Sequence, residues 1–203
     1  MKILKRLHNT LWGVLFTSLL LLGSSSATRK PSPQAWGEVV SGLQISIYLD
    51  QAEGVQSNAP KFRVEFRNAG EFDLILNLGT MLANGKKQHP NAVVLTLTDA
   101  RGKSRRLDLL LPGIIAGRVD PLIVPIPVGA MFSIPVDLEK YWAATSGEFD
   151  CKLKPGNYSL QAEFAGKGVG QQEANLDVQG IALMPYWTGR VTSNHLQFEV
   201  SSR

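Results

Sequence analysis

The sequence predicts an all-β fold: an antiparallel β-sandwich of about eight strands, preceded by an N-terminal signal segment. The segment 61–68, KFRVEFRN, alternates strictly between apolar and charged residues, which places all its apolar side chains on one face of a strand. The same alternation recurs at least six more times, separated by turn-forming residues. No helical period continues over about 11 residues after the signal segment. Many short strands with regular turns are typical of a sandwich or barrel.

The first 27 residues have the composition of a secretory signal. Cations at the start are followed by an apolar run over 11–22 and by small residues ending at Ala27. We expect cleavage near Thr28 and export of the protein to the periplasm or the medium, with no stable membrane span afterwards. Retention of the segment as an anchor is the alternative. No cysteine lies near the cleavage point, which argues against a lipid anchor.

Removal of the signal leaves a nearly neutral chain. It takes three cations from the 21 Lys and Arg and leaves 18 against 17 Asp and Glu, a net charge of about +1. This balance gives no support for nucleic-acid or membrane binding. The 203 − 27 = 176 remaining residues suffice for one core. The one cysteine, Cys151, excludes an intrachain disulfide and is interpreted as a small hydrophobic residue, with a reactive thiol as the alternative.

The chain is divided into a flexible leader over 28–41, whose Trp36 can dock onto the domain, and a sandwich domain over 42–203. The segments 79–92 and 112–127 are predicted as loops, the second because its four prolines cannot donate hydrogen bonds within a sheet. A long connection over 165–191 leaves open a short strand around Leu176 and Val178. The predicted strands are 43–49, 61–68, 72–78, 93–97, 107–111, 132–138, 158–164 and 196–200.

Five short segments follow one another along the chain: NAG (68–70), NAVVLTLTDARGK, PVGAMFSIPVDL, LKPGNYSLQAEF and SNHLQFEV. Together they resemble bacterial immunoglobulin-like domains, and their order is similar to that of the intracellular proteinase inhibitor (BsuPI) family and of uncharacterised exported proteins. The resemblance implies an Ig-like sandwich over about 42–200, in which Tyr158 packs at a corner. The inhibitory residues are not carried over, because this chain has a signal segment and places Ser104, Arg105 and Arg106 where an aromatic residue is expected.

Counting strand passes predicts where a partner would bind. If every strand crosses the sandwich and reverses, the loops 50–60, 79–92, 112–130 and 165–191 share one end, and long loops at one end of a sandwich often bind partners. Aromatic anchors suit protein interfaces, and flat rings suit sugars. The alternative is that the apolar and aromatic side chains of these loops fold inward and close the open end of the sandwich. The candidate partner-binding residues are Tyr186, Trp187, Met184, Ile114, Ile115 and Leu122.

No motif indicates catalysis, a cofactor or a metal site. His89 and His195 have no neighbouring nucleophile motif and no zinc spacing, so no catalytic, cofactor-binding or metal-binding residue is predicted. The basic residues at 86, 87, 101, 103, 105 and 106 are interpreted as solvated charges rather than a polyanion site.

The predicted function is that of a noncatalytic, exported Ig-like module that binds a protein or an envelope component. A secreted proteinase inhibitor and a carbohydrate-binding module are the alternatives, and a structural assembly subunit is a further one. The inhibitor predicts saturable inhibition of a serine proteinase. The carbohydrate-binding module predicts that Trp187→Ala abolishes retention on glycans.

Overall fold

The computed structural model describes residues 35–50, 60–82, 85–111, 118–143, 153–168 and 185–201. The predicted signal segment, Cys151 and the strand considered around Leu176 lie outside these residues. The chain divides into two units, Met1–Ser32 and Pro33–Arg203, and the description below concerns the second unit.

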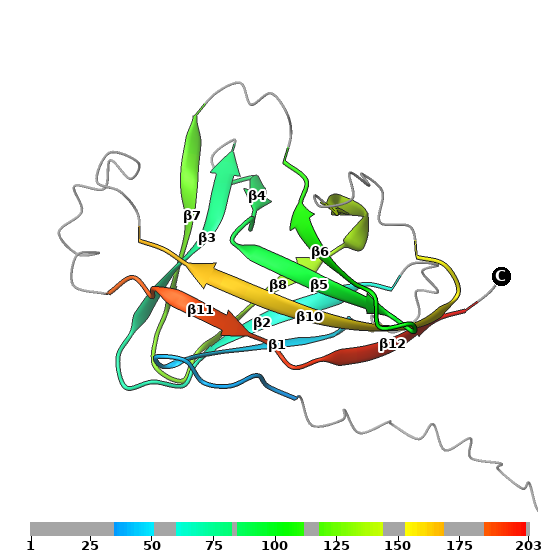
Figure 1. The fold of residues 1–203 in the computed structure, drawn as a ribbon. Helices are drawn as coiled ribbons and strands as arrows, with labels where there is room; N and C mark the ends of the chain where they lie inside the picture. Colours follow the sequence, from blue (N-terminus) through cyan, green and yellow to red (C-terminus); the bar gives the residue numbers. More distant parts are fainter. Residues whose placement is uncertain are drawn as a thin grey trace, which may run out of the picture. The chain divides into compact units, whose positions relative to one another are not determined.

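The predicted fold class is confirmed: the described residues form an all-β sandwich in which every pair of named strands is antiparallel (Figure 1). A single 3-10 turn, η1 (Leu138–Lys140), interrupts the strands. The strands are β1 (Leu43–Leu49), β2 (Phe62–Asn68), β3 (Leu74–Leu82), β4 (Lys87–His89), β5 (Val93–Asp99), β6 (Ser104–Leu109), β7 (Val119–Ile126), β8 (Met131–Val136), β9 (Tyr141–Trp142), β10 (Gly156–Gly166), β11 (Gly189–Thr192) and β12 (Leu196–Val200).

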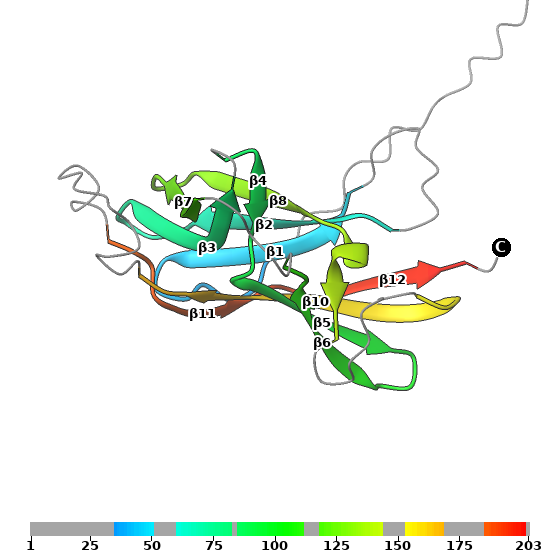
Figure 2. The same cartoon turned by 90° about the horizontal axis from the view of Figure 1, so that it is seen from above.

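Two sheets form the layers of the sandwich. One has the order β1-β2-β8, and the other has the order β11-β10-β5-β6-β9, with β12 also pairing with β10. Figure 2 shows the first sheet lying over the second. Aromatic side chains meet between the layers: Phe66 packs edge-on against Phe164 with ring centroids 5.4 Å apart, and Phe62 packs against Phe198 at 5.0 Å. The apolar face predicted for 61–68 is therefore the core face.

A third sheet, β4-β3-β7, corrects two loop predictions. The segment 79–92 contains the end of β3 and all of β4, and the segment 112–127 contains β7. A register shift between Asn77 and Gly79 breaks the alternation of β3. The sequence pattern therefore does not indicate that this strand continues to Leu82. Strand β7 contains Pro121 and Pro125 and lies at an edge of its sheet, where a missing N–H donor is tolerated.

Other differences concern short or terminal segments. Twelve strands are described against about eight predicted, and β9 and β11 have only two and four residues. Phe72, predicted to begin a strand, precedes β3 and is exposed. In the described part of the leader, the Gly37 amide donates to the Ile45 carbonyl of β1 at 2.9 Å. Trp36 docks against Arg67, as predicted.

Candidate partner-binding surface

The predicted grouping of the long loops is wrong for the loop 50–60. The segment 79–92 does lie beside the 165–191 connection, because the Ala165 amide donates to the Ala92 carbonyl at 3.2 Å. The residues around Gly42 precede β1, and the loop 50–60 follows it. The Trp187 indole Nε1 donates to the carbonyls of Val40 and Ser41, so the end of the 165–191 connection lies near the start of β1. The turn after β2 lies there too, because the Ala69 amide donates to the Gly42 carbonyl at 2.7 Å. The pass count failed because β3 was assumed to cross the sandwich. It belongs to the separate β4-β3-β7 sheet, and its Leu78 carbonyl accepts from the Ala92 amide, beside the end of β10.

Trp187 is a core residue and not an exposed anchor. Only 3% of it is exposed, and its ring stacks on Phe164 with centroids 5.5 Å apart and planes at 28°. Its amide donates to the Ile75 carbonyl at 2.9 Å. The ring fits because Gly166 lacks a side chain: a Cβ there would lie 2.3 Å from the indole Cε3. The structure thus favours the inward-folding alternative for this residue.

The other predicted site residues are not brought together as a surface. Leu122 is 5% exposed on β7 and belongs to the core, so its predicted exposure is wrong. Tyr186 is partly buried beside Ile75, and burial raises the pKa of its hydroxyl. Met184, Ile114 and Ile115 lie outside the described residues, and their role stays a prediction.

Three other apolar side chains are exposed on two turns at the start of β1. Phe72 is 73% exposed, Met131 59% and Val128 50%. We call these residues the apolar platform. Phe72 lies in the turn between β2 and β3, whereas Val128 lies in the turn between β7 and β8 and Met131 begins β8. The Val128 amide donates to the Asp73 carboxylate at 2.9 Å, so the two turns are in direct contact.

A fully buried amide, Asn68, holds both turns of the platform. Its Nδ2 donates to the carbonyl of Phe72 at 2.8 Å and to that of Ile126 at 2.9 Å, while its Oδ1 accepts from the Gly70 amide at 3.0 Å. Its backbone also bonds to the turn at 129–130. Buried polar groups whose bonds are all made fix one local conformation. The platform is therefore presented on a rigid support.

Arg67 extends the platform on the outer face of the β1-β2-β8 sheet. It lies opposite Met131 in the register. Because Asn68 makes the hydrogen bonds to β8, Arg67 and Met131 form a non-hydrogen-bonded pair, whose side chains lie close together on one face. The guanidinium carbon lies 5.9 Å from the centroid of the Trp36 ring, within the range of a cation–π contact.

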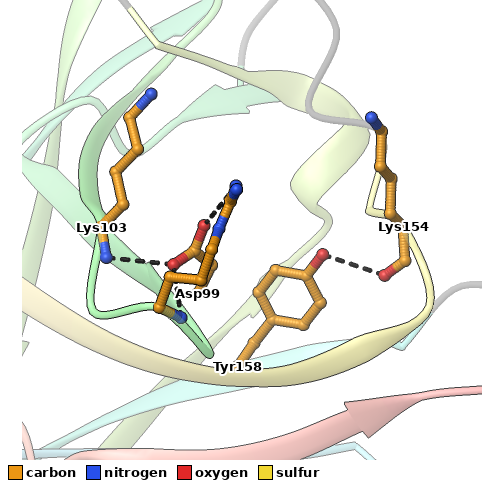
Figure 3. A network of polar contacts seen from close by, with 5 residues as sticks. Asp99, Lys103, Lys154 and Tyr158 are labelled. Carbon is orange, nitrogen blue, oxygen red and sulfur yellow. Dashed lines mark hydrogen bonds and ion pairs between the residues drawn. The ribbon is translucent and has the colours of Figure 1, made fainter.

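A polar hairpin joins β5 and β6 in the other sheet of the sandwich, as shown in Figure 3. The Asp99 carboxylate accepts from the amides of Lys103 and Arg101 at 3.0 and 2.9 Å. The bond from Lys103, supported by the bond and the charge of Arg101, holds the pKa of Asp99 below its usual range. These contacts shape the turn and leave the carboxylate bound by its own hairpin.

Tyr158 has the corner role that the family resemblance implies. Its hydroxyl donates to the carbonyl of Lys154, four residues earlier, at 2.9 Å (Figure 3), which matches a tyrosine corner. Its ring stacks on Phe198 at 5.6 Å. Tyr158 therefore packs at the corner of the sandwich.

Two of the basic residues of the hairpin form ion pairs with carboxylates of the same hairpin. Arg101 pairs with Asp99 and Arg106 with Asp108. Within the described part of the chain, no group of three or more His, Cys, Asp or Glu residues could hold a metal ion. Over the same residues, no helix has the length and apolar character needed to cross a membrane.

Comparisons with known proteins add little. No protein-family model matches the chain, and no curated protein matches it. Among solved structures, the chain is similar to SoR45, a target of the Northeast Structural Genomics Consortium, with a TM-score of 0.37 and 11% identity over 80% of this chain and 89% of that chain. A likeness this weak carries no argument about function, and the resemblance to the BsuPI family stays a prediction.

Sequence reasoning missed the apolar platform, although a local signal was present. Phe72 stands between Glu71 and Asp73 just after an Asn-Ala-Gly turn, and an aromatic residue flanked by two charges in a turn favours exposure. Val128 directly precedes Gly129, whose φ of +74° is typical of a glycine turn, and Met131 follows that glycine by two residues. Their proximity to Phe72 depends on the contacts of Asn68 and Asp73, which no local pattern reveals.

Proposed function

We propose that this protein is a noncatalytic, exported binding module that recognises a protein partner through the apolar platform. The observation that carries the proposal is the exposure of three large apolar side chains on turns that a buried asparagine holds in place. Soluble proteins rarely leave such side chains together in water without a use for them. Phe, Met, Trp and Arg are also the residue types enriched at the centres of interfaces.

The rigidity of the support favours binding over plain solvent exposure. Ordering a mobile loop on association costs free energy, so a surface that is already ordered binds more tightly for the same contacts. Asn68 removes this cost for both turns at once. A protein partner is favoured over a glycan because the platform consists of aliphatic and aromatic side chains on turns.

Photo-crosslinking in cells of the source organism tests the proposal. A photoreactive amino acid is placed at position 72 or 131 of the full chain, and a control carries it at position 101, an exposed site on the hairpin that joins β5 and β6 in the other sheet. We expect a discrete crosslinked protein from positions 72 and 131 and none from position 101. The crosslink from position 131 should disappear when Phe72→Ser is added.

The same experiment can refute the proposal. Identical products from all three positions would indicate random collision, and no product at 72 and 131 would mean that the apolar platform has no protein partner. Thermal unfolding of Phe72→Ser provides the folding control, because an exposed residue is expected to change stability by no more than about 0.5 kcal/mol.

A further inference from the structure

We infer that Arg67 reads a carboxylate of the partner, so that the apolar platform selects a protein segment in which Asp or Glu lies beside a large apolar side chain. This inference rests on the proposed function and specifies the chemistry of the partner. It starts from a difference between Arg67 and the other arginines that the structure describes.

Five other arginines are bound by carboxylates of this chain. Arg63 pairs with Asp50, Arg118 with Asp120 and Arg190 with Glu163, and the two hairpin arginines pair as described above. Arg105 also has an interaction within the chain. Arg67 differs: among the described residues it contacts an aromatic ring and no carboxylate.

The ring contact orients the guanidinium without providing an oxygen acceptor. A cation over an aromatic face is held by the negative charge of the ring face. A guanidinium carries five N–H donors in a planar fork that fits a carboxylate with two parallel bonds. Trp36 thus restricts Arg67 to one region of the surface, and the described residues leave its hydrogen-bonding capacity for another molecule.

The apolar side chain beside Arg67 completes the recognition element. Met131 is opposite Arg67 on the same face and is well exposed, so a bound segment can place a carboxylate on Arg67 and an apolar group on Met131. The apolar neighbour also removes water from the ion pair, which strengthens its attraction. The charge sets specificity, and the apolar contact supplies most of the affinity.

Selection of random peptides displayed on phage tests the inference with a defined probe. The full chain is immobilised as wild type, Arg67→Gln, Arg67→Glu and Phe72→Ser, with Arg101→Gln as a control for loss of an exposed arginine. We expect wild type and Arg101→Gln to enrich peptides with Asp or Glu next to an apolar residue. Arg67→Gln should lose the acidic preference, and Arg67→Glu should favour Lys or Arg instead.

The affinity of one enriched acidic peptide for each variant then measures how much Arg67 contributes to binding. Arg67→Gln loses a charge-assisted hydrogen bond, which is expected to weaken the affinity for the peptide about tenfold to hundredfold. Arg67→Lys should restore part of the affinity, because lysine keeps the charge but not the planar fork. All variants are checked for unchanged unfolding temperatures, so that a loss of binding is not a loss of fold.

The outcomes separate the two proposals. Peptides that bind without acidic preference, and are lost in Phe72→Ser, would overturn the role of Arg67 while leaving the apolar platform as the binding surface. Peptides that are unaffected by Phe72→Ser, or the absence of any enriched peptide, would overturn both.

Discussion

Trp187 and Phe72 are aromatic residues in irregular segments near the start of β1, yet their environments are opposite. The sequence predicts Trp187 as an exposed anchor and Phe72 as the inward-facing start of a strand. The structure buries the first and exposes the second. The two residues differ in their contacts. The indole of Trp187 donates to the carbonyls of Val40 and Ser41 and packs where Gly166 has no side chain. In contrast, the side-chain amide of Asn68 donates to the backbone carbonyl of Phe72 and leaves the Phe72 ring in solvent.

The comparison predicts that Trp187→Ala has the largest effect on stability. It removes a buried ring and leaves two carbonyls without their indole donor, so we expect a loss of about 3–5 kcal/mol in the free energy of unfolding. Urea denaturation monitored by circular dichroism measures it. Trp187→Phe should cost clearly less, because the stacking on Phe164 is retained. A change below 1 kcal/mol for Trp187→Ala would show that the residue is not part of the core.

Asn68→Ala should have the next largest effect. It removes the donor to two carbonyls and the acceptor of the Gly70 amide, and each buried group left without a partner costs about 1–3 kcal/mol. We expect a total loss of about 2–4 kcal/mol and faster hydrogen exchange in both turns of the apolar platform, measured by mass spectrometry. Gln44→Ala, which removes a single side-chain bond to the Gly37 carbonyl, is the control. Faster exchange in only one turn would contradict the joining role of Asn68.

Gly166→Ala tests the space that receives Trp187. The added Cβ would lie 2.6 Å from the Trp187 carbonyl oxygen as well as 2.3 Å from the indole, and backbone cannot move away easily. We expect a loss of about 1–3 kcal/mol, as for other overpacked sites. Gly168→Ala is a matched control two residues later, since nothing lies within 4 Å of its added Cβ. Equal unfolding temperatures for the two variants would contradict this packing.

The sequence was sufficient for regular strands but not for the contacts between irregular segments. Strand β1 begins and ends at the predicted residues, and the hairpin predicted over 93–111 is confirmed, because alternation and turn chemistry are local. Its second strand is Ser104–Leu109 rather than 107–111, and Leu111, predicted to face inward, is exposed. Strand β7 was missed, since its prolines are acceptable only at a sheet edge, and edges are a property of the assembled fold. The burial of Trp187 depends on Val40, distant by 147 residues. No local pattern contains that information.

The same limit applies to the surface. The aromatic residues that attracted attention in the sequence were those in long loops, whereas the apolar platform lies on two short turns. The two turns are far apart in the sequence: the bond from Val128 to Asp73 spans 55 positions, and the bond from Asn68 to Ile126 spans 58. Local reasoning could identify Asn68 as a turn residue but not as the group that joins two turns.

The smallest expected effect concerns the Asp99 turn, whose side chain makes only local bonds and thus contrasts with Asn68. Because the pKa of Asp99 is lowered in the folded protein, its contribution to stability is present above the pKa of the unfolded chain and is lost as pH falls through the lower, folded value. Wild type should therefore exceed Asp99→Asn in unfolding temperature at neutral pH, and the difference should narrow progressively as the pH falls below about 4, the ordinary pKa of an aspartate. Arg101→Gln should keep most of the gap, since the Lys103 amide is the main cause of the shift. A gap that persists unchanged in acid would mean that the charge of Asp99 does not stabilise the turn.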